Sequence, residues 1–281
     1  MLPRTNSPAD EPPAGAGAQY DVLYMISLAQ GLLGAASGSL VGFSLGVIGG
    51  GGSILAVPLM VYLVGVPNAH EAIGTSSLAV AASAAFGLLI HARTGTVKWG
   101  CASVLAGAGV IGAFLGSLVG KMVDGQRLLT MFALLMLVVA VLMRRRRDHD
   151  GNKSVQLNRA NAPALAGVGL ATGMLSGFFG IGGGFLIVPA LVFATDMPLV
   201  YAVSSSLVAV LAFGLTTATS YAFSGLVNWP LTAVFIVGGL AGGYIGVKSA
   251  HLLASRRTLL NDVFVGVISC VAIYMLIRSW M

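Results

Sequence analysis

Charged residues are scarce in this chain, with 15 Lys and Arg and 9 Asp and Glu among 281 residues. An average soluble domain carries about a quarter of its residues as charges, and so few charges cannot cover a surface in water. Hydrophobic residues make up 57% of the sequence. The composition excludes an ordinary soluble protein. The net charge of +6 gathers in a few loops, which indicates membrane topology and no nucleic-acid partner.

Cysteines and catalytic motifs are equally scarce. Cys101 and Cys270 lie in apolar runs without a CxxC spacing or His neighbours, and we predict that both are buried free thiols. The chain has no HExxH, no GxSxG, no GxxxxGK(S/T) and no cluster of Cys and His. The sequence therefore predicts no enzyme, no cofactor and no metal site. Any transport should draw on an ion gradient or on the gradient of the substrate.

Long uncharged stretches are abundant instead. Residues 102–119, 128–143 and 263–277 approach the roughly 20 apolar residues that a helix needs to span a bilayer. The 39 glycines suit helices that pack closely in lipid. The predicted fold class is an all-α membrane protein, a bundle of helices embedded in the lipid bilayer.

Two copies of one pattern fill the chain, because 42–58 superposes on 173–189 without a gap. After a two-residue deletion, a hydroxyl triplet in each copy is matched, and His91 meets Tyr221 one residue out of step with the triplets. We therefore predict two transmembrane repeats. The predicted organisation is a disordered tail at 1–20, a first repeat at 21–144, a basic linker at 145–161 and a second repeat at 162–281. The matched glycines and prolines are Gly42, Gly46, Gly49, Gly51, Gly52 and Pro58 with Gly173, Gly177, Gly180, Gly182, Gly183 and Pro189.

Each repeat is predicted to contain five hydrophobic segments. The second segment of each copy is too short to cross a bilayer as a straight helix, and a glycine run precedes it. The first two segments of each copy are therefore predicted to form a broken or hairpin pair within the membrane, followed by three spanning helices. The segments are 22–46, 53–66, 72–92, 99–121 and 128–144 in the first copy, and 163–181, 184–195, 200–223, 230–250 and 259–278 in the second.

Basic residues predict the orientation, since short cytoplasmic loops collect Lys and Arg. The run Arg144 to Arg147 places the linker at 144–161 in the cytoplasm and both termini outside it. Equivalent loops of the two copies then lie on opposite sides, which is typical of the inverted-topology repeats of secondary transporters. Lys121 and Arg127 fall on the outer side and depart from this rule.

The two glycine runs are the predicted substrate site. Glycines permit a sharp turn with accessible backbone N–H groups, and a helix that starts at about Ser53 or Phe185 would direct its positive dipole end at the break. A small anion would bind there. The alternative is that these glycines only allow close helix packing, but two matched runs, each followed by a proline, favour broken helices. The candidates are Gly49, Gly50, Gly51, Gly52 and Ser53, with Gly182, Gly183 and Gly184.

The hydroxyl triplets form the second candidate group, at the start of an apolar helix in each copy. Three hydroxyls in a row would supply uncharged donors to an oxyanion. The alternative, of equal weight, is helix capping or hydrogen bonding to carbonyls of the same helix. The candidates are Thr75, Ser76 and Ser77, with Ser204, Ser205 and Ser206.

Ionisable side chains near the apolar segments are candidates for proton coupling. His91 is the predicted proton-coupling residue because its unperturbed pKa lies near neutrality. His70 and Glu71 follow Pro67 and are predicted to be a solvated helix cap. Trp99 and its match Trp229 are predicted to be interfacial anchors.

The doubled glycine-proline motif, the TSS and SSS triplets and the two GxVxW turns resemble the TauE/SafE family of sulfite and sulfonate exporters over residues 25–278. The resemblance implies a secondary transporter in the bacterial inner membrane. It implies proton-coupled export of sulfite, sulfoacetate or related organosulfonates. A passive anion channel, or a permease for another small anion, is the alternative from the same class, and a membrane-embedded enzyme or scaffold comes from another. No particular oligomeric state is predicted.

Overall fold

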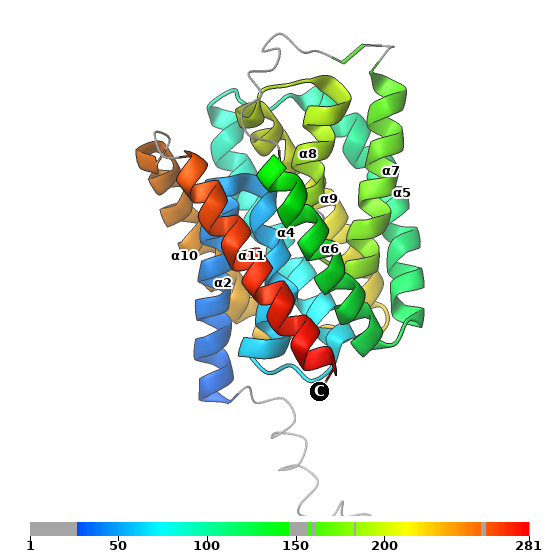
Figure 1. Cartoon of the computed structure of the whole chain (residues 1–281), viewed down its shortest axis with the longest axis vertical. Coiled ribbons are helices and arrows are strands. Elements are labelled where there is room, and N and C mark those ends of the chain that lie inside the picture. The colour runs from blue at the N-terminus through cyan, green and yellow to red at the C-terminus, as the bar shows by residue number, and fades with distance from the viewer. Residues whose placement is uncertain (1–26, 146–156, 159–160, 183, 254–256, 281) are drawn as a thin grey trace, which may run out of the picture.

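The structure is a computed structural model that describes residues 27–145, 157–158, 161–182, 184–253 and 257–280 (Figure 1). The predicted tail at 1–20, Gly183 and most of the predicted linker at 145–161 lie outside the described residues. Every regular element within them is helical.

The helices follow one another along the chain with short connections. The first repeat contains α2 (Leu28–Ile48), η1 (Gly49–Leu55), α3 (Ala56–Pro58), η2 (Leu59–Leu63), α4 (Ala69–Arg93), α5 (Trp99–Met122) and α6 (Gly125–Arg145). The second contains α7 (Ala162–Phe179), α8 (Gly184–Thr195), α9 (Leu199–Ala222), α10 (Trp229–Leu253) and α11 (Arg257–Trp280).

Local sequence explains where several helices begin. A capping box of Ser27 and Gln30 starts α2, and the Asn68 side chain accepts a hydrogen bond from the backbone N–H of His70 at the start of α4. The Asp124 carboxylate accepts from the backbone N–H groups of Gln126 and Arg127 in the same way at the start of α6.

The predicted fold class is confirmed: within the described ranges, seven helical stretches are long and apolar enough to cross a membrane. Large apolar side chains that face outward on α5 and α6, among them Phe114, Leu134 and Val138, suit contact with lipid tails. Cys101 is buried as predicted. Cys270 is exposed, so the prediction of a second buried thiol was wrong, because this residue lies on an outward face of α11.

Most predicted segments agree closely with the observed helices, and the segment predicted at 184–195 coincides with α8. The predicted start of a helix near Ser53 was wrong. A 3-10 helix, η1, already begins at Gly49, because a single residue with positive φ suffices to turn the chain. The segment then passes through a short α-helical turn and ends in the π-helix η2.

The two repeats pack on each other reciprocally. The first helix of each repeat lies along the third long helix of the other, so that α2 packs on α10 and α7 on α5. In addition, α4 packs on α9 and α6 on α11. Glycines bring the backbones together: a Cβ atom on Gly42 would meet the backbone of Gly239, and one on Gly173 would meet that of Gly109.

Corresponding helices run in opposite directions in Figure 1. The chain enters α2 near the bottom of the view and α7 near the top, and α6 and α11 cross the front in opposite senses. These directions agree with an inverted repeat. The placement of equivalent loops of the two repeats on opposite sides of a membrane stays a prediction.

Candidate functional site

The first glycine break folds the chain back on itself. Gly49 has φ of 71° and ψ of −145°, a conformation that only glycine adopts readily. A Cβ atom on Gly52 would meet the backbone of Ser44 and Leu45, so η1 returns alongside the end of α2. Every residue of η1 is buried. The predicted hairpin of the first repeat is therefore present.

The second glycine break also reverses the chain, but with a different backbone geometry. Gly180 ends α7 in the left-handed conformation, with φ of 67°, and Gly182 also has a positive φ of 64°. Two such residues reverse the chain before α8 begins at Gly184. Gly180 packs so closely on Ile73 of α4 that a Cβ atom would collide with that side chain, as a Cβ atom on Gly49 would with Val203 of α9.

The two breaks meet each other inside the bundle. A Cβ atom on Gly50 would lie 2.6 Å from the Cα atom of Gly184, and one on Gly184 would overlap the backbone of Gly50. The N-terminal ends of the helical run 49–63 and of α8 therefore adjoin. Ser53, at 0% exposure, donates its hydroxyl to the Gly50 carbonyl oxygen at 2.9 Å.

The hydroxyl triplet of α4 lies beside the second break and is fully buried. Ser77 donates to the carbonyl oxygen of Gly180 in the other repeat at 2.8 Å. Thr75 accepts a hydrogen bond from the backbone N–H of Asn228 at 3.0 Å, and Ser76 donates to the Ile73 carbonyl in its own helix at 3.2 Å. Two of these three hydroxyls therefore join the repeats.

The triplet of α9 makes related contacts. Ser205 accepts from the backbone N–H of Lys98 at 2.9 Å, and Ser206 donates to the Val203 carbonyl of its own helix at 2.7 Å. The Ser204 hydroxyl lies 3.3 Å from Nδ1 of His91 and also donates to Val200.

These contacts correct the predicted match of the triplets by one residue. One hydroxyl of each triplet accepts from the residue before the tryptophan that begins a helix of the other repeat. Thr75 accepts from Asn228, before α10, and Ser205 accepts from Lys98, before α5. Thr75 therefore corresponds to Ser205 and not to Ser204, and the deletion between the copies is a single residue. Because three hydroxyl residues follow one another in each copy, the sequences can be aligned in either register. The hydrogen-bond partners distinguish the two registers.

His70, which the sequence analysis did not select for proton coupling, lies between the two repeats. His70 is partly buried: its Nε2 lies 3.1 Å from the Val123 carbonyl, and its buried Nδ1 has no hydrogen-bond partner among the described residues. Its ring lies 6.3 Å from that of Tyr221, whose buried hydroxyl has none there either. A solvated cap was therefore the wrong interpretation of this side chain.

Tyrosine in the second repeat replaces histidine of the first repeat at two matched positions. In the register that superposes the glycine runs, His70 matches Tyr201, and after the single-residue deletion His91 matches Tyr221. A lysine ammonium lies over each tyrosine ring: Lys98 is 4.8 Å from the centroid of Tyr201, and Lys121 is 5.7 Å from that of Tyr221. The two matches follow the same pattern, from histidine to tyrosine. This pattern was the sequence signal that could have added His70 to the candidates for proton coupling.

Comparison with known proteins gives the class. A probable membrane transporter protein of Xylella fastidiosa (strain Temecula1) is 51% identical over 245 residues, covering 87% of this chain and 94% of that relative. The probable membrane transporter protein YunE of Bacillus subtilis is 26% identical over 273 residues, covering 89% and 97%. No solved structure matches the chain.

The broken apolar helices and these relatives define a multi-pass membrane transporter, not an enzyme. The chain belongs to the sulfite exporter TauE/SafE family, whose model matches residues 33–275. The resemblance inferred from the glycine-proline motifs is thereby confirmed.

Proposed function

We propose that this transporter moves small sulfur-containing anions, such as sulfite, sulfoacetate or related organosulfonates, across the bacterial inner membrane. The description of the family as sulfite exporters supports this substrate class and supports export as the direction. Proton coupling is part of the proposal, with His91 as the coupling residue.

The observation that carries the proposal is the meeting of two helical N-terminal ends at Gly50 and Gly184. The first N–H groups of a helix have no partner within that helix, and together with the positive ends of the helix dipoles they favour an anion there. Discontinuous helices that meet between two repeats form the substrate sites of several transporter folds. The proposed binding residues are Gly49, Gly50, Gly51, Gly52, Ser53, Thr75, Ser76, Ser77, Gly182, Gly183, Gly184, Ser204, Ser205 and Ser206.

Access to this site requires movement of the repeats. The backbones of Gly50 and Gly184 lie too close together to admit a ligand between them. Ser77, Thr75 and Ser205 hydrogen-bond across the interface between the repeats. When the repeats rock apart, these hydroxyls lose their protein partners and become donors for the anion. Opening alternately to each side would give alternating access.

The orientation in the membrane belongs to the same proposal. The repeats at 21–144 and 162–281 face opposite ways, the linker at 144–161 is cytoplasmic and both termini are extracytoplasmic. The linker begins with four arginines, Arg144 to Arg147, which supports a cytoplasmic location.

His91 is suited to coupling because its ring adjoins the α9 triplet. Its Nδ1 lies 3.3 Å from the Ser204 hydroxyl, and Ser204 precedes Ser205, which bonds across the repeats. Because Ser204 donates its hydroxyl hydrogen to Val200, it accepts from Nδ1–H of His91, and protonation of the ring adds a positive charge beside the triplet. Protonation is thereby linked to the contact between α4 and α9.

Flux through purified protein in liposomes tests the proposal. We expect saturable sulfite flux, accelerated by an imposed pH gradient, with protein-free liposomes as the background. Methanesulfonate should compete with sulfite for this flux. Flux that rises linearly with concentration and ignores the pH gradient would support the rival anion channel, and no flux of any sulfur oxyanion would refute the substrate class.

A further inference from the structure

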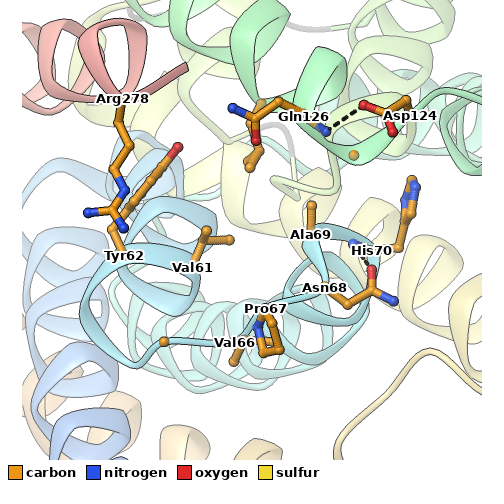
Figure 2. Close-up of a pocket in the computed structure, with 13 residues that line it drawn as sticks. Val61, Tyr62, Val66, Pro67, Asn68, Ala69, His70, Asp124, Gln126 and Arg278 are labelled. Atoms are coloured by element: carbon orange, nitrogen blue, oxygen red, sulfur yellow. Dashed lines mark hydrogen bonds between the residues drawn. The ribbon is translucent and has the colours of Figure 1, made fainter. Parts of the chain in front are cut away.

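A separate hollow opens at the end of the bundle where α4 and α6 begin. Its volume is about 810 Å³, within the range of sites for small ligands. It is bounded by η2, by the starts of α4 and α6 and by the C-terminal end of α11 (Figure 2). Its lining includes none of the proposed substrate residues that the structure describes.

A guanidinium group borders the hollow. Arg278 projects from α11 beside Tyr62 of η2, and its Nη1 lies within 3.4 Å of the Tyr274 hydroxyl, to which it donates. Tyr274 in turn packs edge-on against Tyr62, with ring centroids 5.4 Å apart. This cluster holds the guanidinium at the rim. Arginine presents five N–H donors in a fork that matches the oxygens of a sulfonate or phosphate.

The acidic group of the hollow lies apart from that arginine. In Figure 2 Asp124 and Arg278 stand on opposite sides of the opening. The Asp124 carboxylate is engaged as the cap of α6, accepting from the backbone N–H of Gln126 at 3.0 Å. The Asn68 carbonyl oxygen caps α4, so its amide group remains as a donor on the floor. The side near Arg278 therefore favours an anion.

The hollow is connected to the glycine break through the chain itself. The helical run that starts at Gly49 ends in the π-helix η2, where Val64 donates to the Leu59 carbonyl at 2.9 Å. Single turns of π-helix are frequent at functional sites. Movement of this run would shift Val61 and Tyr62 in the wall of the hollow together with Gly50.

We infer that this hollow is an oxyanion-binding vestibule, in which Arg278 binds the anion at the outer end of the transport path. The inference rests on the proposed function for the identity of the anion, but its charge selectivity is measurable without transport. The same chemistry would recognise the phosphate of a lipid headgroup, so the experiment must separate a dissolved anion from a lipid.

Thiol labelling in the hollow provides the test. Val61→Cys is introduced into a variant without the native thiols, Cys101→Ala and Cys270→Ser. The new thiol is reacted with two methanethiosulfonates of similar size, one carrying a sulfonate and one a trimethylammonium group. We expect the ratio of the anionic to the cationic rate to fall about fivefold or more in Arg278→Gln, as the loss of a nearby unit charge predicts. Arg278→Lys should retain the ratio. Lys248→Gln, which removes an exposed charge on α10, is the matched control.

Two further measurements decide the source of the anion. Methanesulfonate should slow the anionic reagent when Arg278 is present, both in maltoside micelles and in phosphatidylcholine nanodiscs. Slow reaction of the anionic reagent in nanodiscs, whether or not methanesulfonate is present, would assign the site to a lipid headgroup and overturn the vestibule. An unchanged ratio in Arg278→Gln, repeated with Gln126→Cys as a second reporter, would also overturn it. Sulfite flux in liposomes with an unchanged ratio would leave the proposed function standing and remove only the vestibule.

Discussion

The two glycine breaks reach the same meeting point along unlike paths. The first turns on Gly49 alone and continues as a 3-10 helix, whereas the second uses Gly180 and Gly182 and resumes as an α-helix. Gly50 and Gly184 are nevertheless each packed against the other's backbone. The contact between the helical N-terminal ends is thus shared by the repeats, while the local geometry that produces it is not.

The difference lies in what each turn demands of its glycine. The left-handed conformation of Gly180, with ψ of 28°, is open to other residues at a cost of about 1–2 kcal/mol. The conformation of Gly49, with ψ of −145°, is almost confined to glycine. Substitution of Gly180 is therefore restricted mainly by the neighbouring side chains, and substitution of Gly49 mainly by its own backbone conformation.

Gly184→Ala should produce the largest effect, because the added methyl group meets the backbone of Gly50 and no side chain can move aside. We expect a loss of about 3 kcal/mol in unfolding free energy, the upper end for overpacking, together with loss of sulfite flux. Thermal unfolding in detergent measures the first. Gly167→Ala is the matched control in α7, where a Cβ atom meets nothing within 4 Å. Equal melting temperatures for the two variants would contradict the contact between the breaks.

A pair of double-mutant cycles tests the asymmetry of the two turns. Gly180→Ala should be partly rescued by Ile73→Ala, since that side chain occupies the space of the new methyl group. Gly49→Ala should gain less from Val203→Ala, because backbone strain persists after the collision is removed. We expect a coupling of about 1–3 kcal/mol in the first cycle and about 0.5 kcal/mol in the second. Equal coupling in both would mean that packing governs both turns.

The sequence predicted the parts of this comparison that depend on composition and spacing. Glycine runs before a short apolar segment indicated both hairpins, and the residues of α8 followed from their hydrophobicity and Pro189. The 3-10 and π geometry from Gly49 to Leu63 could not be predicted, because three helical hydrogen-bonding patterns differ little in the side chains they favour. The site residues were chosen from the same glycine pattern, but the hydrogen bonds of their hydroxyls depend on the facing helix.

Two hydroxyls with equivalent roles should respond alike. Thr75→Val and Ser205→Ala each leave the backbone N–H of a loop residue without its acceptor, Asn228 in one repeat and Lys98 in the other. We expect each to lower the unfolding free energy by about 1–2 kcal/mol. A large loss in one variant alone would refute the corrected one-residue register.

Ser76→Ala and Ser206→Ala separate stability from binding. Each hydroxyl donates to a carbonyl three residues earlier in its own helix, which also has its helical partner. Stability should change by about 0.5 kcal/mol or less. If the hydroxyls serve the anion when the repeats open, the KM for sulfite should rise several-fold at unchanged melting temperature. An unchanged KM in both variants would remove them from the proposed site.

His91→Gln should have the smallest effect on stability, about 0.5 kcal/mol or less, because the side chain is partly exposed and glutamine still reaches a hydroxyl. Its effect on proton coupling should be specific. A pH gradient should no longer accelerate sulfite flux, while exchange of sulfite without a gradient should continue. His70→Gln at the other end keeps a donor for the Val123 carbonyl and serves as the comparison. If only His91→Gln uncouples flux, the two histidines differ in function although a tyrosine matches each of them in the second repeat. If both uncouple it, the two histidines of the first repeat belong to one shared proton path. Uncoupling by neither would remove histidine from the coupling mechanism.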